Sequence, residues 1–406
     1  MRRFMNFICA AAVAVAPFIL VSCNPEDNTK ESEAEKQLKA AVEEYVPDVI
    51  YEIYGNLADA TSKLYDQLAA FKAKGLGSAS QSDIDAICAT FLDARAQWEA
   101  SEAFLYGAAT VYGIDPHIDT WPLNKDKLAK ELSNAAVIAD LDEEGAGAAD
   151  EVGVSNLGFH GIEFILFRDG ANRKLSDLKG NEKDETFAAY KVSGADEIIF
   201  ATAVAEDLRN YCWQLQAAWD PDAPEDRVEY VEEELELNTV MDNGLTFGEN
   251  MLAATKPGST MATWQRAVST ILVAGCSNIC NEVANSKIAS AYYATDPDYI
   301  ESPYSKKSYT DFLNNLLSIQ YSLYGRAGAS TPSKDCIMKV LGNQKYSGVA
   351  ALQSALDEAV KALNACVASG VAFVDDPDAA CAAKAMETLN TLDAELNKAA
   401  DFVETL

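Results

Sequence analysis

The sequence predicts an all-α fold made of two helical-bundle domains. Apolar residues recur at three- and four-residue spacing through nearly the whole chain, as expected for helices with one buried face. The alternation of apolar and polar residues that indicates strands is not sustained in any segment. At 406 residues, the chain is long enough for two domains with sizeable cores.

The N-terminal segment is typical of a bacterial lipoprotein signal peptide. Two arginines begin it, an apolar run too short for a stable membrane span follows, and a small residue and Cys23 end it. We therefore expect residues 1–22 to be removed and Cys23 to be lipidated, with residues 23–33 forming a polar tether. An ordinary secretory signal with a chance cysteine is the alternative.

The rest of the chain divides into helices separated by polar breaks. Ser82 precedes Asp83 and Asp85, and acidic residues in a first turn suit the positive end of a helix. An acidic, proline-containing break near residue 225 separates two helical parts, which we interpret as domains of residues 34–225 and 226–406. An ancient duplication would fit this symmetry, although no convincing sequence repeat is present. Helices are expected over about 34–73, 82–106, 123–140, 155–167, 186–219, 260–293, 308–325, 347–369 and 376–404.

Charge and hydropathy limit the classes of partner. The chain has 63 acidic and 32 basic residues, a formal net charge of −31, so it should be repelled by nucleic acid and by anionic membrane surfaces. After the signal peptide, no further run is expected to have transmembrane length. We therefore expect a soluble body whose contact with the membrane is the lipid anchor alone.

Cysteine usage gives little indication of disulfides or thiolate sites. Nine cysteines are present, and seven remain when the one in the signal peptide and Cys23 are set aside, so at least one must stay free. Most lie in apolar helical stretches and are interpreted as small buried hydrophobic residues. Cys276 and Cys280, four residues apart, are also interpreted as core residues, with a soft-metal site as the alternative.

A histidine and a glutamate lie together in an otherwise apolar stretch. Residues 158–163 read Gly-Phe-His-Gly-Ile-Glu, which places His160 and Glu163 on one helix face. A carboxylate buried without a partner is costly, so a metal, a cation or a hydrogen-bond network must compensate it. On these two residues alone, a core histidine with satisfied hydrogen bonds is the alternative. His117, the other histidine, is predicted to be a surface loop residue.

Charged residues also interrupt the apolar face of the helix predicted at 82–106. Arg95 and Glu102 fall on the same stripe as Trp98, and such residues are rarely fully buried unless they are paired. One interpretation is an internal salt-bridge network. The other is that Glu102 shares a site with His160 and Glu163, while Arg95 holds a carboxylate in place. One histidine with two or three carboxylates is a ligand set for iron, zinc, manganese or copper.

Several segments of the chain resemble the imelysin-like family. Residues 158–163 match its G-x-H-x-x-E signature, and segments 95–107 and 118–124 are similar to the family as well. Asn124 stands where the family often has aspartate. The segment 302–311 loosely resembles the serine-rich turn of the family's second half. The ordered combination covers most of the mature chain and is more specific than the hexapeptide alone.

This resemblance implies a bacterial envelope protein involved in iron binding and uptake, with a site near the interface of two helical bundles. The cargo would be iron or another transition-metal ion, arriving as a free ion, a chelate or haem, and partners would belong to envelope uptake. The anchor would lie in the outer membrane, with its periplasmic or surface side left open. The implied ligands are His160, Glu163 and Glu102, and the implied supporting residues are Arg95, Trp98, Asp119, Trp121, Gly158 and Ser305.

Two alternatives to iron uptake stay open. The family has also been classed as metallopeptidases, but the H-E-x-x-H arrangement of many zinc peptidases is absent, so we do not expect an enzyme. A non-catalytic helical scaffold that binds a protein or glycan partner is the other alternative. Phosphate-binding loops, dinucleotide fingerprints and the G-x-S-x-G elbow are also absent from the sequence.

Overall fold

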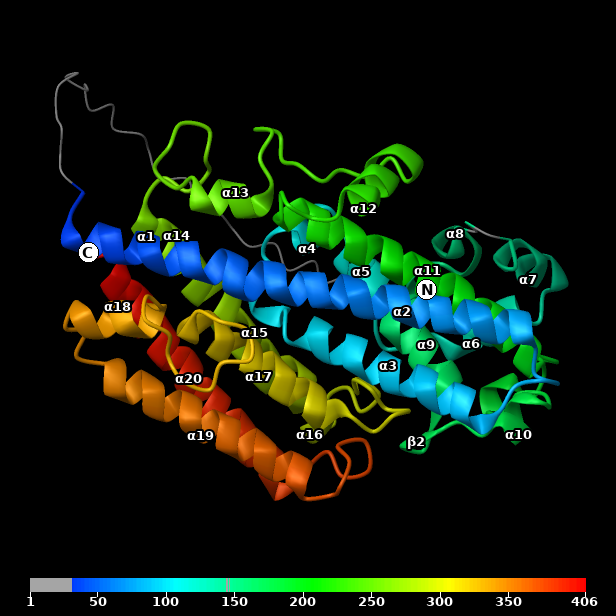
Figure 1. The fold of residues 1–406 in the computed structure, drawn as a ribbon. Coiled ribbons are helices and arrows are strands. Elements are labelled where there is room, and N and C mark those ends of the chain that lie inside the picture. Colours follow the sequence, from blue (N-terminus) through cyan, green and yellow to red (C-terminus); the bar gives the residue numbers. More distant parts are fainter. Residues whose placement is uncertain (1–30, 144, 146) are drawn as a thin grey trace, which may run out of the picture. The chain divides into compact units, whose positions relative to one another are not determined.

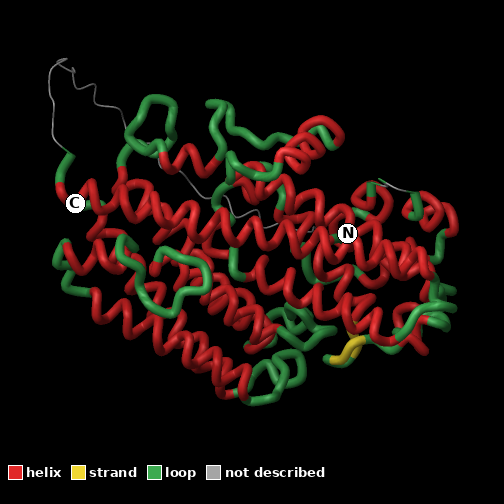
Figure 2. Tube along the Cα trace, in the orientation of Figure 1, coloured by secondary structure: helices red, strands yellow, loops and turns green. Residues whose placement is uncertain are grey.

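The long helices lie where the apolar periodicity of the sequence predicts them. A computed structural model describes residues 31–406 except 144 and 146, and the regular secondary structure of this part is almost entirely helical (Figures 1 and 2). The predicted all-α class is therefore confirmed. The predicted signal peptide, the lipidation site Cys23 and most of the tether lie outside the described residues. Residues Glu33–Leu406 form one compact unit, and the boundary near residue 225 stays a prediction.

Three long helical segments dominate the first part of the chain. The first, predicted as one helix at 34–73, passes through a π-helical turn and then packs against the next two (Figure 1). Ser80 and Ser193 begin the second and third segments with capping boxes, in which serine and an aspartate three residues later bond each other's backbone. These elements are α1 (Glu33–Tyr45), η1 (Val46–Tyr51), α2 (Glu52–Lys74), α3 (Gln81–Glu99) and α11 (Gly194–Trp219).

Short elements connect α3 to α11 and include the histidine segment. A small β-hairpin with two residues in each strand, the yellow segment in Figure 2, directly follows α9. The connecting elements are η2 (Glu102–Phe104), α4 (Ala108–Val111), α5 (Asp115–Ile118), α6 (Lys125–Leu132), α7 (Ala135–Leu141), α8 (Ala148–Val152), η3 (Val154–Asn156), α9 (Gly158–Leu166), β1 (Phe167–Arg168), β2 (Ala171–Asn172), α10 (Leu175–Leu178) and η4 (Glu185–Phe187).

In the last part of the chain, α19 and α20 pack along each other, and α17 packs against both α19 and α3. A run of alternating α- and π-helical segments covers the predicted helix at 260–293 and contacts α20. The elements are α12 (Glu225–Glu229), η5 (Tyr230–Glu234), α13 (Phe247–Leu252), α14 (Trp264–Thr270), η6 (Ile271–Ser277), α15 (Asn278–Glu282), η7 (Val283–Ile288), α16 (Ala289–Tyr292), α17 (Ser308–Tyr324), α18 (Ile337–Asn343), α19 (Val349–Ala368) and α20 (Ala380–Val403).

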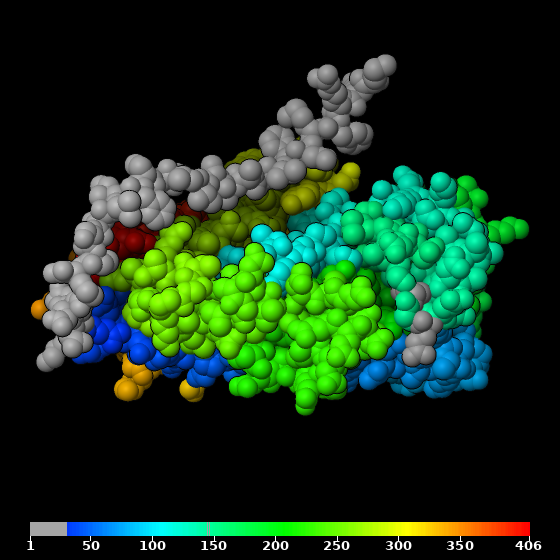
Figure 3. Space-filling view, turned by 90° about the horizontal axis from the view of Figure 1, so that it is seen from above, coloured from blue at the N-terminus to red at the C-terminus, as the bar shows by residue number. Residues whose placement is uncertain are grey.

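The structure corrects some predicted boundaries. The helix expected at 123–140 is two short helices, because Asn134 leaves the helical conformation and its side chain caps α7. The break predicted after residue 220 contains α12, η5 and α13. Tyr112 donates a hydrogen bond to the carbonyl of Val240 at 2.6 Å, so this segment lies against the α4 region, as the green and cyan surfaces of Figure 3 also show.

The expectation that no later segment has transmembrane length is wrong, because one helical run is long and apolar enough to cross a membrane. Among the described residues, Trp264–Tyr292 is a 29-residue helical run with a mean hydropathy of 1.3 over its most apolar window. However, 67% of that window is buried inside the fold. Burial against other helices accounts for its apolar character, as in the core helix of many soluble domains.

The described cysteines agree with their interpretation as core residues. All seven are free, and six of them, including Cys276 and Cys280, are buried. Burial raises the pKa of the Cys276 thiol to about 12 and raises that of Cys280 as well. Because a soft metal binds the thiolate, this environment disfavours a metal site at the pair.

Candidate metal centre

A buried ionic cluster lies where α3, η2, α9, η7 and the start of α17 meet two loops. Six of its side chains are carboxylic acids and three are basic, and all nine are buried. Charged residues are rarely buried without partners, so this concentration needs a physical explanation. We call it the ionic centre, and its members are Arg95, Glu99, Glu102, Asp119, His160, Glu163, Lys287, Glu301 and Asp311.

A glycine allows α9 to reach this centre. Gly158, the first residue of α9, has a φ of 64°, a left-handed conformation that favours glycine. A Cβ atom at this position would lie 2.1 Å from the carbonyl oxygen of Ile118. The helix therefore begins directly against the segment that precedes Asp119, and His160 follows half a turn later. This contact gives a physical reason for the predicted supporting role of Gly158.

The imidazole of His160 lies between two carboxylates. Its Nε2 is 2.9 Å from Asp119 Oδ1 but lacks the alignment of a hydrogen bond, and its Nδ1 is 3.6 Å from Glu163 Oε2. Burial alone would lower the pKa of His160, whereas contacts with Asp119 and Glu163 raise it to about 9. The ring is thus protonated at neutral pH, and a metal that binds Nε2 must displace that proton.

Asp119 is held from two sides by residues of α3. Trp98 Nε1 donates a hydrogen bond to Asp119 Oδ2 at 2.9 Å, and the guanidinium of Arg95 forms an ion pair with Oδ1. Burial would raise the pKa of Asp119, but the charges of Arg95 and His160 hold it well below its usual range. Asp119 is therefore an ionised carboxylate with a fixed orientation. The sequence predicted it only as a supporting residue.

Glu301 is one of four members of the centre that sequence reasoning missed, with Glu99, Lys287 and Asp311. Its Oε1 lies 2.6 Å from Arg95 Nη2 and 3.2 Å from Lys287 Nζ, while its Oε2 has no hydrogen-bond partner. One ligand atom each from Asp119, His160 and Glu301 lie within 4.8 Å of one another. A single ion could therefore contact all three. The available signal was an acid that directly precedes the serine-rich turn.

Glu163 connects α9 to that serine-rich turn. The backbone N–H of Ser305 donates a hydrogen bond to Glu163 Oε1 at 2.7 Å, so Ser305 contributes its main chain at this contact. The other carboxylate oxygen, Oε2, has no hydrogen-bond partner and faces His160 Nδ1. Glu163 thus contacts the ring on the side away from Asp119, and it is not part of the Asp119–His160–Glu301 group.

Glu102 belongs to a second group that also includes Asp119. One oxygen each from Glu99, Glu102 and Asp119 lie within 4.8 Å of one another. Burial raises the pKa values of Glu99 and Glu102 well above their usual range, despite the nearby positive charges. Lys287 Nζ stands 3.5 Å from Glu102 Oε1. Glu102 is therefore connected to His160 through Asp119, which belongs to both groups.

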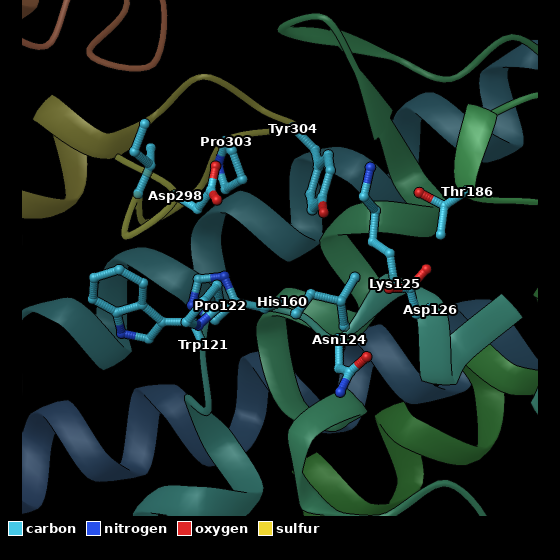
Figure 4. A pocket seen from close by; sticks show the side chains of 12 residues that line it. Trp121, Pro122, Asn124, Lys125, Asp126, His160, Thr186, Asp298, Pro303 and Tyr304 are labelled. Atoms are coloured by element: carbon cyan, nitrogen blue, oxygen red, sulfur yellow. The ribbon is translucent and has the colours of Figure 1, made fainter. Parts of the chain in front are cut away.

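Two cavities open onto the ionic centre. His160 lines one of about 560 Å³, together with Trp121, Lys125, Asp298 and Tyr304 (Figure 4). A second cavity of about 390 Å³ is lined by further residues of the centre. Trp121, predicted as a supporting residue, lines both cavities, and its ring lies 4.0 Å from that of Tyr299. The second cavity includes Glu102, Asp115, Asp119, Trp121, Glu282 and Lys287 in its lining.

The prediction that His117 is a surface loop residue is wrong. It lies in the short helix α5 and is partly buried. Its Nδ1 is 3.0 Å from Asp207 Oδ2, and its ring stacks on Tyr211 with 3.6 Å between centroids. His117 is thus engaged in contacts with α11, and it provides a natural control for experiments on His160.

Chemically, the ionic centre is suited to a cation. An imidazole nitrogen with carboxylate oxygens is a donor set that iron, zinc and manganese accept. Two buried atoms that could act as metal ligands, His160 Nε2 and Glu301 Oε2, have no hydrogen-bond partner, although nearly all buried polar atoms in proteins have one. A cation bound between them would satisfy both.

Comparison with known proteins relates the chain to imelysin-like and iron-regulated proteins. The sequence model of the family described as Imelysin matches residues 50–399. Iron-regulated protein A of Synechococcus elongatus is 23% identical over 274 residues, which are 68% of this chain and 61% of that protein. The chain thus matches less than two thirds of that relative's length.

Two solved structures have a similar fold. One, from Parabacteroides distasonis, is a provisionally assigned iron-regulated protein A precursor, with a TM-score of 0.72 and 22% identity. It covers 93% of this chain and 97% of its own. The other is an imelysin-like protein from Psychrobacter arcticum, with a TM-score of 0.58, 12% identity and coverage of 89% and 93%. At these identities, the likeness concerns the fold alone.

Proposed function

The chain belongs to the imelysin family, and on that premise we propose that it binds a transition-metal ion, iron above all, for uptake at the bacterial cell envelope. The observation that supports this most is the group formed by Asp119, His160 and Glu301. Their ligand atoms lie within 4.8 Å of one another, and two of the three side chains have a buried atom without a hydrogen-bond partner. Glu163 and Glu102, the other predicted ligands, border this group.

Charge supports a cationic cargo. The six acids of the ionic centre outnumber its three bases, so three acids must be neutralised by protons or by a bound cation. Burial raises the pKa of Asp311 to about 7, as it also raises those of Glu99 and Glu102. A metal can therefore enter in exchange for protons, without the loss of Arg95 or Lys287.

The size of the cavity beside His160 indicates which form of iron could reach the centre. The cavity of about 560 Å³ reaches His160 directly, so we infer that a hydrated ion or a small iron chelate arrives from this side. Haem, with His160 as an axial ligand, is the larger alternative. Iron-regulated relatives are consistent with an iron cargo, since their names record regulation by iron.

The location is also a proposal. We infer a lipid anchor at Cys23 that holds the protein on the outer membrane, where it would meet the envelope components of an uptake system. The order of basic, apolar and small residues before Cys23 supports this. Replacement of Cys23 by alanine should move the protein from the membrane to the soluble fraction, and unchanged fractionation would contradict the anchor.

Metal binding is tested by calorimetric titration of the full mature chain with Fe²⁺ without oxygen, and with Mn²⁺ and Zn²⁺. The expected result is about one equivalent bound by the wild type. His160→Ala should weaken binding by more than about 100-fold, because loss of a ligand exceeds the 10–100-fold effect typical of supporting residues. His117→Ala is the matched control and should bind normally. Equal titrations for the wild type and His160→Ala would contradict the proposal.

A metallopeptidase is the second candidate, and one observation favours it. Glu163 Oε2 has no hydrogen-bond partner and lies 3.6 Å from the ring of His160, where a general base could stand. Chelator-sensitive cleavage of an unfolded protein substrate, lost in Glu163→Gln, would support the peptidase. Metal binding without cleavage would leave uptake as the function.

A further inference from the structure

We propose that the ammonium group of Lys287 acts as a built-in cation that occupies the second carboxylate group of the ionic centre and limits the centre to one metal ion. This inference rests on the proposed function, because it concerns how many ions the same centre holds. Its basis is the geometry of two overlapping groups of ligands and the position of one buried lysine.

The two groups of ligands share one residue. Asp119 belongs both to the group with His160 and Glu301 and to the group with Glu99 and Glu102. In each group the ligand atoms lie within 4.8 Å of one another. The arrangement therefore offers two neighbouring positions for cations, connected by the carboxylate of Asp119. Metal centres with two ions use shared carboxylates of this kind.

A positive charge already lies between the two groups, beside Glu102 of the second and Glu301 of the first. Lys287 is 1% exposed, and its Nζ lies 3.5 Å from Glu102 Oε1 and 3.2 Å from Glu301 Oε1. The amide oxygen of Asn315 is a third neighbour at 3.4 Å. An ammonium ion is costly to bury unless anionic groups surround it, and here two carboxylates do so. Its charge would repel a metal ion at the same place.

Arg95 has a different task. Its planar guanidinium contacts Asp119, Glu99 and Glu301 from the α3 side and so fixes three carboxylates in place. Lys287, by contrast, is a compact charge on a flexible stem that extends from η7. Glu99 is further fixed by the amide of Asn315, which donates a hydrogen bond to its Oε2. Of the two buried cations, Lys287 is the one that contacts Glu102, and it is therefore the one that a metal could replace.

Access from outside also favours the second position. Glu102, Asp119 and Lys287 all line the cavity of about 390 Å³, together with the acids Asp115 and Glu282. An ion in this cavity would meet four carboxylic acids and the single ammonium group. Without that group, the cavity would lead to an unoccupied set of carboxylates. Lys287 thus determines whether this side of the centre accepts a metal.

The test compares the wild type with Lys287→Gln, which keeps a polar side chain but removes the charge. Mn²⁺ is titrated by calorimetry, and bound metal is counted by elemental analysis after desalting. We expect one equivalent for the wild type and two for Lys287→Gln, with the second lost again in Lys287→Gln/Glu102→Gln. Lys306→Gln, which removes a lysine paired with Asp375 outside the centre, is the charge-matched control and should keep one equivalent.

The outcomes separate this inference from the proposed function. One equivalent in both the wild type and Lys287→Gln would overturn the role of Lys287 and leave the metal centre standing. No metal in the wild type but one in the variant would overturn both, because the wild-type centre would then hold no ion for Lys287 to limit to one. No metal in either protein would overturn both.

Should Lys287→Gln fail to fold, anomalous diffraction from wild-type crystals soaked in Mn²⁺ decides the question. A single peak at the Asp119–His160–Glu301 group supports the inference. A second peak between Glu99 and Glu102 overturns it.

Discussion

The protein contains two ionic clusters, one fully buried and one partly buried, that are built differently. The ionic centre has six acids and three bases. The second cluster lies beside the β-hairpin after α9 and pairs two arginines with two glutamates. We call it the arginine network, and its members are Arg168, Arg173, Glu182 and Glu197. One cluster therefore has an excess of acid, while the other is balanced.

The two clusters also differ in how completely their buried polar atoms are hydrogen-bonded. Arg173 forms a two-pronged contact with Glu197 at 2.8 and 2.9 Å, and Glu182 also accepts hydrogen bonds from two backbone N–H groups. No fully buried side-chain atom of these four described residues lacks a partner, whereas five such atoms lie in the ionic centre. The comparison teaches that an excess of acid, together with buried polar atoms that lack partners, distinguishes the candidate metal centre from the charge-balanced arginine network.

The largest expected effect on stability is at Arg173. Arg173→Met would leave Glu197 buried without its guanidinium partner and Glu182 with Arg168 alone, and breaking a buried pair in this way typically costs about 3–5 kcal/mol. Urea denaturation should show this loss in the free energy of unfolding, with metal binding unchanged in the protein that remains folded. A loss below about 1 kcal/mol would remove the structural role assigned to the arginine network.

An intermediate effect is expected on the free energy of unfolding at low pH, through Glu182. Burial would raise the pKa of Glu182, but a hydrogen bond with Glu197 and the charges of Arg168 and Arg173 lower it to about 2. A lowered pKa in the folded state means that Glu182 stabilises the protein above its unfolded pKa of about 4.5. That stability is lost as the pH falls toward 2. Glu182→Gln should therefore flatten the dependence of unfolding free energy on pH between about 4.5 and 2, and an unchanged slope would contradict this.

The smallest effect on stability is expected at Glu301, although it lies fully inside the protein. Glu301→Gln removes one acid from a centre that holds several neutral carboxyls, and one of these can ionise in its place. We expect the metal-free variant to lose less than about 2 kcal/mol. Metal affinity should nevertheless fall by at least tenfold, since a ligand is lost. A loss of stability as large as that of Arg173→Met would erase the distinction between the two clusters.

The sequence alone predicted much of the fold and one half of the centre. The helix periodicity placed the long helices. The shared face of His160 and Glu163 and the charged stripe of Arg95 and Glu102 indicated four residues that the structure brings into one buried cluster. Short elements such as α5 were missed, because four residues carry too little periodic signal and form only through tertiary contacts.

The other half of the centre depends on contacts between distant segments. Glu99, Lys287 and Glu301 come together only when α3, η7 and the loop before α17 pack, and no local pattern links them. A single lysine in an otherwise apolar helical run was a usable signal, since an unpaired charge there would be costly. The predicted two-domain boundary and the roles of the ligands stay predictions.

One side chain, that of Trp121, contributes to both cavities that reach the ionic centre. Since Trp121 lines both cavities, its indole is a wall that the two cavities share. A rotation of that ring would change the lining of both cavities at once. Access to His160 from one cavity and to Glu102 and Asp119 from the other is therefore coupled through the position of a single side chain.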